Sequence, residues 1–227
     1  MKKYEFTDQT KNWCGRILHR IRALISFGDV DAGDIGGWIE KEENLSHEGD
    51  AWVYGDAMVY DNARVCDNAR VCDNARVCGD AMVYGDAMVY GDAWVYGDAM
   101  VYDNARVCDN ARVCGNARVY GDAMVYDNAR VCDNARVCDN ARVCGNARVC
   151  DNARVCGDAD VMWISKIGSR NSTTTFFKSK LGIEVACGCF LGTIDEFENK
   201  VKETHGENEH AQAYFLAIAL AKLRIKI

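Results

Sequence analysis

Between residues 49 and 162 the hydrophobic and polar positions repeat every six residues, without insertion or deletion. The segment holds nineteen hexads, and each has alanine at its third position and valine at its fifth. In an extended segment the fourth and sixth positions point away from the valine between them. Because valine is also β-branched, this pattern favours strands with alanine and valine inside. We therefore predict one short strand, of about three residues, in every hexad.

The first two positions of each hexad predict a corner. They read Gly-Asp, Asp-Asn or Gly-Asn, so each hexad contains a residue that tolerates a left-handed backbone. One strand and one corner in every six residues close most simply as a three-sided coil of about 18 residues per turn, with rungs about 4.8 Å apart. A single hexad cannot bury its apolar face alone, so the pattern predicts a stacked solenoid of just over six turns.

The repeat and its flanks resemble known solenoid families. The pattern Val-x-x-x-Ala-x, as in residues 65–70, resembles the hexapeptide motif of left-handed parallel β-helices. The flanks GDIGGWIEKEENLS (33–46) and ACGCFLGTIDEFE (186–198) resemble uncharacterised, often phage- or prophage-encoded YdcK-like β-solenoid proteins. The resemblance implies a mainly β protein, a single-stranded left-handed parallel β-helix with a small C-terminal α+β cap. It implies little about activity, and a phage origin would suggest a host or phage protein as partner.

Outside the hexads the composition changes on both sides, which divides the chain into three parts. We interpret 1–48 as an N-terminal capping region, with Trp38 and Ile39 covering the open end of the core. Residues 49–162 form the hexapeptide-repeat solenoid, and 163–227 form a cap of a β-hairpin plus helices. Capping is expected because an uncovered solenoid end exposes a sheet edge.

The C-terminal part contains signals for two strands and two helices. The segments 173–180 and 182–190 read as a hairpin. A capping box of Thr193 and Glu196 begins a helix that should end near residues 205–206. A second helix should begin near 207–208, and it is apolar almost all round from 213 to 221. The last residues, LRIKI, alternate and could instead form a strand. We expect this part to serve as both cap and assembly element.

Charge and hydropathy narrow the range of partners. The formal net charge is −7 and the pI is about 5.2, which argues against nucleic-acid binding. The N-terminal residues lack the apolar run of a secretory signal, and no stretch reaches the roughly 18 apolar residues that span a bilayer. We therefore expect a cytoplasmic protein without a membrane partner.

Thirteen cysteines occur in the chain, and ten of them occupy the sixth hexad position. Because the total is odd and the position is fixed, we interpret them as reduced thiols that act as small apolar side chains. Cys187 and Cys189 could offer two thiolates to a metal, with Cys14 or His205 as distant partners, but their spacing is not a strong metal motif. We assign no metal site and no cofactor.

Enzymatic activity is the rival hypothesis. Familiar enzymes with hexapeptide solenoids are trimeric acyltransferases that use a histidine base on the wall and a loop from a corner. Here the four histidines, at 19, 47, 205 and 210, all lie outside the hexads, and no loop interrupts the repeat. Without a positioned base the general-base step lacks its usual agent. We assign no catalytic residue and keep acyl transfer at a subunit interface as the alternative.

The outward positions suggest two kinds of binding surface. At steps of 18 residues, arginines stack in two series: Arg112, Arg130, Arg148 and Arg118, Arg136, Arg154. Stacked like charges repel unless something neutralises them. The ordinary explanation is the neighbouring corner aspartates, because the hexads hold 18 Asp and 11 Arg. The alternative is an acidic ligand or partner along these arginines.

A second outward surface is apolar. Met82 and Tyr84 fall one rung below Met100 and Tyr102, and exposed Met and Tyr often mark interfaces. We expect self-association there, as a dimer or trimer. The leading hypothesis is a non-enzymatic β-solenoid scaffold or binding protein that uses these arginine, tyrosine and methionine ladders, or its C-terminal cap, for assembly or partner binding.

Overall fold

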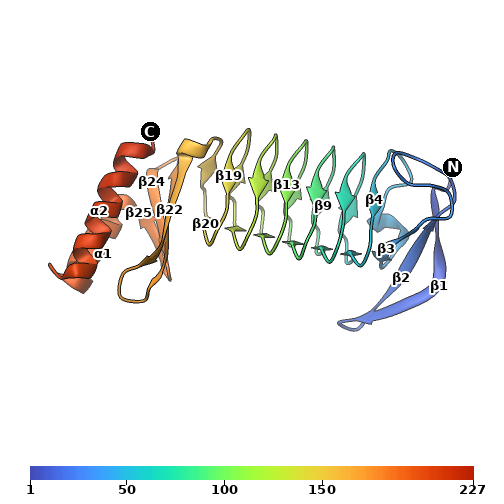
Figure 1. Ribbon diagram of the computed structural model, residues 1–227, viewed down its shortest axis with the longest axis horizontal. Helices are drawn as coiled ribbons and strands as arrows, with labels where there is room; N and C mark the ends of the chain where they lie inside the picture. The colour runs from blue at the N-terminus through green and yellow to red at the C-terminus, as the bar shows by residue number, and fades with distance from the viewer.

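Strands of the repeat pair in parallel at a constant separation of 18 residues. In the computed structural model, which describes residues 1–227, Val71 pairs with Val53 on one side and Val89 on the other. Each of the first eighteen hexads contributes a strand of two residues, shorter than predicted, because the corner occupies the rest. The last hexad, 157–162, departs from the predicted pattern: it forms a 3-10 helix followed by the start of a longer strand, and its alanine, Ala159, is exposed. The predicted parallel β-solenoid is confirmed, and its rungs stack side by side in Figure 1.

The strands form three walls of six hexad strands each. Wall 1 comprises β5 (Met58–Val59), β8 (Arg76–Val77), β11 (Trp94–Val95), β14 (Arg112–Val113), β17 (Arg130–Val131) and β20 (Arg148–Val149). Wall 2 comprises β4 (Trp52–Val53), β7 (Arg70–Val71), β10 (Met88–Val89), β13 (Arg106–Val107), β16 (Met124–Val125) and β19 (Arg142–Val143). Wall 3 comprises β6 (Arg64–Val65), β9 (Met82–Val83), β12 (Met100–Val101), β15 (Arg118–Val119), β18 (Arg136–Val137) and β21 (Arg154–Val155).

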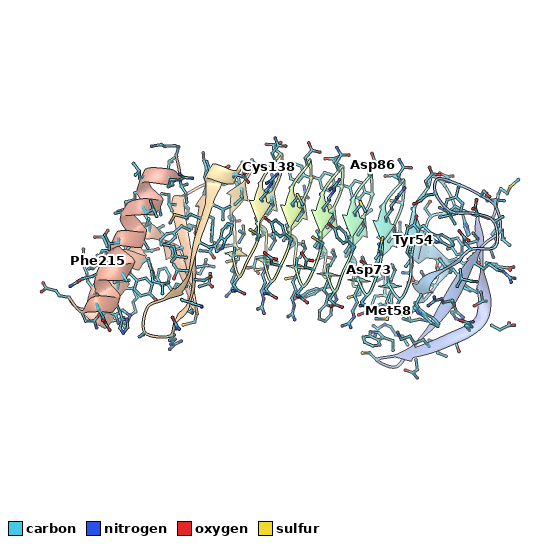
Figure 2. The ribbon with its side chains drawn as sticks, viewed as in Figure 1. Tyr54, Met58, Asp73, Asp86, Cys138 and Phe215 are labelled. Atoms are coloured by element: carbon cyan, nitrogen blue, oxygen red, sulfur yellow. A yellow bond between two sulfur atoms is a disulfide. The ribbon has the colours of Figure 1, made fainter.

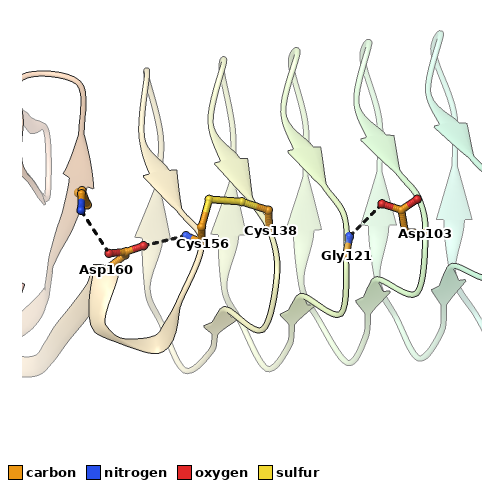
Figure 3. The surroundings of a disulfide bond; sticks show 6 residues. Asp103, Gly121, Cys138, Cys156 and Asp160 are labelled. Carbon is orange, nitrogen blue, oxygen red and sulfur yellow. Dashed lines mark hydrogen bonds and ion pairs between the residues drawn. A yellow bond between two sulfur atoms is a disulfide. The ribbon is translucent and has the colours of Figure 1, made fainter.

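Corners are made by the first residue of the hexad. In all nine DNARVC hexads this residue is an aspartate with φ between 53° and 61°. Seven of these carboxylates accept a hydrogen bond from the backbone N–H eighteen residues later. Figure 3 shows one case, in which Gly121 donates to Asp103 at 3.2 Å. These side chains therefore join successive rungs.

The N-terminal region lies at one end of the solenoid. β1 (Tyr4–Trp13) and β2 (Arg16–Ala23) form a long hairpin, and β3 (Ile35–Ile39) joins it to wall 1 by pairing with β5. The short 3-10 helix η1 (Glu42–Asn44) follows. Ile39 is fully buried, whereas Trp38 lies outside under the Arg20 guanidinium, 4.9 Å from its ring centroid. Only Ile39 therefore fills the core end as expected.

Trp52 occupies a fourth hexad position, where we expect an outward, solvent-exposed side chain, but it is buried. Its side chain is only 1% exposed because Tyr4 and Phe27 pack on it, with ring centroids 6.2 and 5.4 Å away. The hairpin and the loop that follows it thus cover the first rung of wall 2.

Polar side chains satisfy backbone groups at the ends of the stack. Rung N–H groups donate to the following rung, so the first rung's carbonyls have no preceding hexad to supply donors and depend on the N-terminal region. The buried Lys3 ammonium donates to the carbonyls of Gly49 and Ala51 at 3.2 and 2.9 Å, and the Asn44 amide donates to Ala63 at 2.8 Å. At the far end, Asp160 accepts from the N–H of Cys156 at 3.0 Å (Figure 3).

A four-stranded antiparallel sheet closes the far end of the solenoid. After the 3-10 helix η2 (Asp158–Asp160) come β22 (Val161–Ile167), β23 (Ser172–Ser179), β24 (Gly182–Cys187) and β25 (Phe190–Thr193). The predicted hairpin forms the middle of this sheet. Because neighbouring residues on β23 face opposite ways, Phe177 covers the solenoid core and Phe176 enters a second core.

Two helices cover the outer face of this sheet and form the end of the molecule opposite the N-terminal hairpin (Figure 1). α1 (Ile194–His205) begins with the predicted capping box, in which Glu196 N–H donates to Thr193 Oγ1 at 3.3 Å. α2 (Glu209–Arg224) is capped by Asn208. Because α2 continues to Arg224, the alternative reading of LRIKI as a strand is wrong.

Candidate functional site

The outward residues of the walls lie in regular columns, as the side chains in Figure 2 illustrate. On wall 2 the fourth-position residues alternate along the axis: Trp52, Arg70, Met88, Arg106, Met124, Arg142. This alternation keeps every arginine on the wall two rungs away from the next. Arg70 also pairs with Asp29 at 3.0 Å.

Walls 1 and 3 lose this alternation toward the C-terminal region. Each carries three arginines on consecutive rungs in direct register, which we call the wall 1 ladder (Arg112, Arg130, Arg148) and the wall 3 ladder (Arg118, Arg136, Arg154). All six side chains are exposed. The stacking expected from the sequence is therefore present, with like charges on neighbouring strands.

No carboxylate neutralises these ladders. The ion pairs that arginines form in the structure involve only Arg16, Arg20, Arg22 and Arg70. Carboxylates at the corners are engaged elsewhere, with seven accepting backbone N–H groups and four accepting asparagine amides. The ladders make weaker contacts, such as Arg112 over the Trp94 ring at 5.9 Å. The ladder arginines therefore form no direct ion pairs with the corner aspartates, contrary to the ordinary explanation.

The apolar surface on wall 3 is an aromatic stack. Met82 and Met100 are in register, and the rings of Tyr84 and Tyr102 lie parallel with centroids 4.9 Å apart. Tyr120 extends the stack at 5.0 Å. Its hexad, GNARVY, combines an arginine with a sixth-position tyrosine, which is the sequence signal that could have placed it in this surface. Burial raises the pKa of Tyr84 and Tyr102.

Cysteines of the sixth position also stack from rung to rung. Cys138 and Cys156 form a disulfide across adjacent rungs of wall 3 (Figure 3). The expectation that every thiol is reduced is therefore wrong for this pair, because direct stacking at the end of the wall brings both sulfurs together. The other eleven cysteines are free. On wall 1, Cys132 and Cys150 stack beside Asp133, with one ligand atom from each residue within 4.8 Å of the others.

The histidines lie in the two end regions and not on the walls. His47 stacks on Tyr4 with ring centroids 4.3 Å apart, and burial lowers its pKa. His19 stacks on Phe6 at 4.8 Å. At the other end, His205 lies near Cys187 and Cys189, whereas Cys14 is in the turn of the N-terminal hairpin. The structure therefore places no imidazole beside the outward ladders.

No helix in the structure has both the length and the apolar character required to cross a membrane.

Comparison with known proteins supports the solenoid assignment. The family model described as YdcK Beta solenoid repeat matches successive overlapping segments between residues 51 and 157. An Escherichia coli K12 protein named "Uncharacterized acetyltransferase YdcK" is 34% identical over 62 residues, which cover 24% of this chain and 19% of that protein. The chain thus matches about a fifth of the length of this curated relative.

Proposed function

We propose that this chain, whose repeat region (residues 51–157) belongs to the YdcK β-solenoid repeat family, is a non-enzymatic scaffold that binds an acidic ligand or partner. The observation that carries this proposal is the pair of arginine ladders without carboxylate partners. A rigid wall holds these charges at a fixed spacing, and an extended anionic segment could contact several of them at once.

The electrostatics of the ladders favour such a ligand. Two unit charges about 5 Å apart repel by on the order of 1 kcal/mol in water. An anion that bridges neighbouring guanidinium groups would remove this repulsion and form charge-assisted hydrogen bonds. Outside the ladders the hexads are acidic, with 18 Asp against 5 Arg, so they would repel the same ligand. Binding should therefore be confined to the ladders.

Charge reversal on both ladders tests the proposal. The double variant Arg130→Glu/Arg136→Glu changes the central arginine of each ladder, and Arg106→Glu/Arg142→Glu is the matched control. The control arginines are also exposed and without ion pairs, but methionine rungs separate them on wall 2. We expect fluorescently labelled poly-L-glutamate to bind the unaltered protein at low salt, and to bind the ladder variant at least about tenfold more weakly.

The control should retain most of the affinity, and added salt should weaken binding of the unaltered protein. Equal losses in the ladder and control variants would show that only net charge matters. Equal affinity of the ladder variant and the unaltered protein would contradict the proposal. Thermal unfolding of all variants would verify that each still folds.

Self-association is the second part of the proposal, and helix α2 offers a surface for it. Leu216, Leu220 and Leu223 are 74%, 45% and 66% exposed and lie along one face of the helix. The helix is acidic at its start, with Glu209, and basic at its end, with Arg224. An antiparallel second copy would bring opposite charges together while covering the leucines. We therefore propose a second copy of this chain as the occupant.

Two variants separate this helix from the methionine and tyrosine surface of wall 3. Leu216→Glu/Leu223→Glu should halve the molar mass measured by light scattering, because it places charges in the paired helix face. Met82→Glu/Met100→Glu should leave the mass unchanged. The reverse result would place self-association on wall 3, and a monomeric unaltered protein would contradict both.

A hexapeptide-repeat acyltransferase-like enzyme, acting at a subunit interface, is the second candidate function. It is favoured by the name of the E. coli relative, which matches over 62 residues. Its test is thermal stabilisation by acetyl-CoA. An increase of several degrees in Tm, together with a trimer by light scattering, would contradict the scaffold-only proposal, and the absence of a shift would contradict the enzyme.

A further inference from the structure

A cavity of about 470 Å³ opens in the C-terminal region, between the four-stranded sheet and the two helices. Its volume lies within the range of roughly 300–1,000 Å³ that is typical of small-molecule sites. Six of the lining residues determine its chemistry: Arg170, Lys200 and His205, which carry or can carry positive charge, and Phe190, Phe197 and Tyr214, which are aromatic. No ladder arginine and no leucine of the exposed α2 face lines the cavity, although Arg148 donates to the carbonyl of the lining residue Gly188 at 3.4 Å.

Its apolar part is a cluster of three rings. Phe197 packs with Phe190 at 5.2 Å and edge-on against Tyr214 at 5.3 Å, measured between ring centroids. Gly168 makes room for the tyrosine, because a Cβ added there would lie 1.9 Å from the Tyr214 hydroxyl oxygen. Gly168 also has a φ of +72°, which favours glycine. The backbone at this turn is thus shaped around the Tyr214 side chain.

The polar part comes from two different elements. Arg170 lies in the turn between β22 and β23, and Lys200 and His205 lie in α1. No carboxylate lines the cavity. Arg170 forms no ion pair, and Lys200 pairs only with Glu203, at 3.1 Å on the exposed side of the helix. The three groups therefore favour a negatively charged occupant.

Hydroxyl and thiol groups add hydrogen-bonding capacity. Burial raises the pKa of Tyr214 to about 12, so its hydroxyl stays protonated at neutral pH. The Cys187 thiol accepts a hydrogen bond from Thr174 Oγ1 at 3.1 Å and lies 3.6 Å from the Tyr214 hydroxyl. Cys189 also lines the cavity and is exposed. Cys189 can therefore report on occupancy of the cavity.

We propose that this cavity binds a small organic anion with a flat apolar body and one carboxylate, phosphate or sulfonate group. The body would pack on Phe190, Phe197 and Tyr214, and the anionic group would meet Arg170 and Lys200. Aromatic surface beside convergent cations is the combination that such a ligand requires. The inference does not depend on the arginine ladders, so the two proposals can fail separately.

Binding of 1-anilinonaphthalene-8-sulfonate, an aromatic anion whose fluorescence rises in apolar sites, provides the first test. Arg170→Glu/Lys200→Glu should weaken its binding to the full chain by at least about tenfold. Lys166→Glu/Lys180→Glu is the matched control, because Lys166 lies in β22 and Lys180 in the turn between β23 and β24, both outside the cavity, and the change in net charge is equal. The control should bind within about twofold of the unaltered protein.

Alkylation of cysteines locates the bound probe, which could also adhere to the leucines of α2. A saturating concentration should slow iodoacetamide modification of Cys189 at least about fivefold, as a ligand in the cavity covers its thiol. Modification of Cys14, exposed at the other end of the molecule, should continue at the same rate. Phenyl phosphate or benzoate, added in excess, should displace the probe and lower its fluorescence. An unprotected Cys189 with the probe bound, or equal affinity of Arg170→Glu/Lys200→Glu and the unaltered protein, would overturn the proposal.

Discussion

The solenoid and the C-terminal region build their cores in different ways. The solenoid core repeats two small side chains, and nearly every Ala and Val of the hexads is completely buried. The C-terminal core contains 13 buried residues of mixed size, among them Phe176, Phe197 and Tyr214. In the first region each residue meets copies of itself above and below. In the C-terminal core, large side chains pack between strands and helices that are not repeated elsewhere in the chain.

This difference shows where diversity of chemistry can arise. A repeated core gives every rung the same backbone, so only the outward side chains change from rung to rung. Those side chains stay aligned in columns. The C-terminal region instead brings unlike residues together, and it contains the cavity with convergent cations and aromatic rings. The solenoid therefore offers extended, repetitive surfaces, whereas the C-terminal region offers a concave one.

The largest expected effect contrasts the two cores directly. Phe176→Ala removes a fully buried ring from the C-terminal core and should lower the free energy of unfolding by about 3–5 kcal/mol. Val107→Ala, in the middle of wall 2, removes two methyl-sized groups and should cost about 2 kcal/mol. Urea unfolding followed by circular dichroism measures both. A larger cost for Val107→Ala would contradict the comparison.

An intermediate effect is expected at the N-terminal end of the stack. Lys3→Met leaves the carbonyls of Gly49 and Ala51 without their donor and should lower the free energy of unfolding by about 1–3 kcal/mol at pH 7. Burial lowers the pKa of Lys3 to about 8 from an ordinary value of 10.5. Between these two pH values the unfolded chain holds the extra proton, so stability contributed by Lys3 rises with pH.

The difference in stability between the unaltered protein and Lys3→Met should therefore grow as pH increases from about 8 toward 10. Other titrating groups are shared by the two proteins and cancel in this difference. A difference that shrinks over the same interval would show that the ammonium form, and not the neutral amine, is the better partner for these carbonyls.

The smallest effect is expected at the start of α1. Thr193→Ala removes the hydroxyl that accepts from Glu196 N–H and should cost about 1 kcal/mol. Hydrogen exchange should accelerate in the first turn of α1 and remain unchanged in the solenoid walls. Thr10→Ala, at an exposed site in the N-terminal hairpin, provides the control. Faster exchange throughout the chain would mean that the Thr193 N-cap stabilises the whole molecule and not only the first turn of α1.

Several features of the binding surfaces could be predicted from the sequence, and others could not. The columns of Arg112, Arg130 and Arg148 follow from counting 18 residues, because each rung repeats the one before it. Counting residues could not predict that these arginines lack carboxylate partners. This lack depends on the rotamers of the corner aspartates, which turn to the N–H groups of the next rung.

Short-range period and composition set several features of this protein. These are the inward Ala and Val, the 18-residue register and the capping box of Thr193 and Glu196, for which each residue's neighbours lie a fixed number of positions away. The burial of Trp52 by Tyr4 and Phe27, and the cavity that joins Arg170 to Lys200, depend instead on how the whole chain folds. These contacts join segments without periodic relation, so their partners are set by how the ends of the chain fold back and not by the repeat.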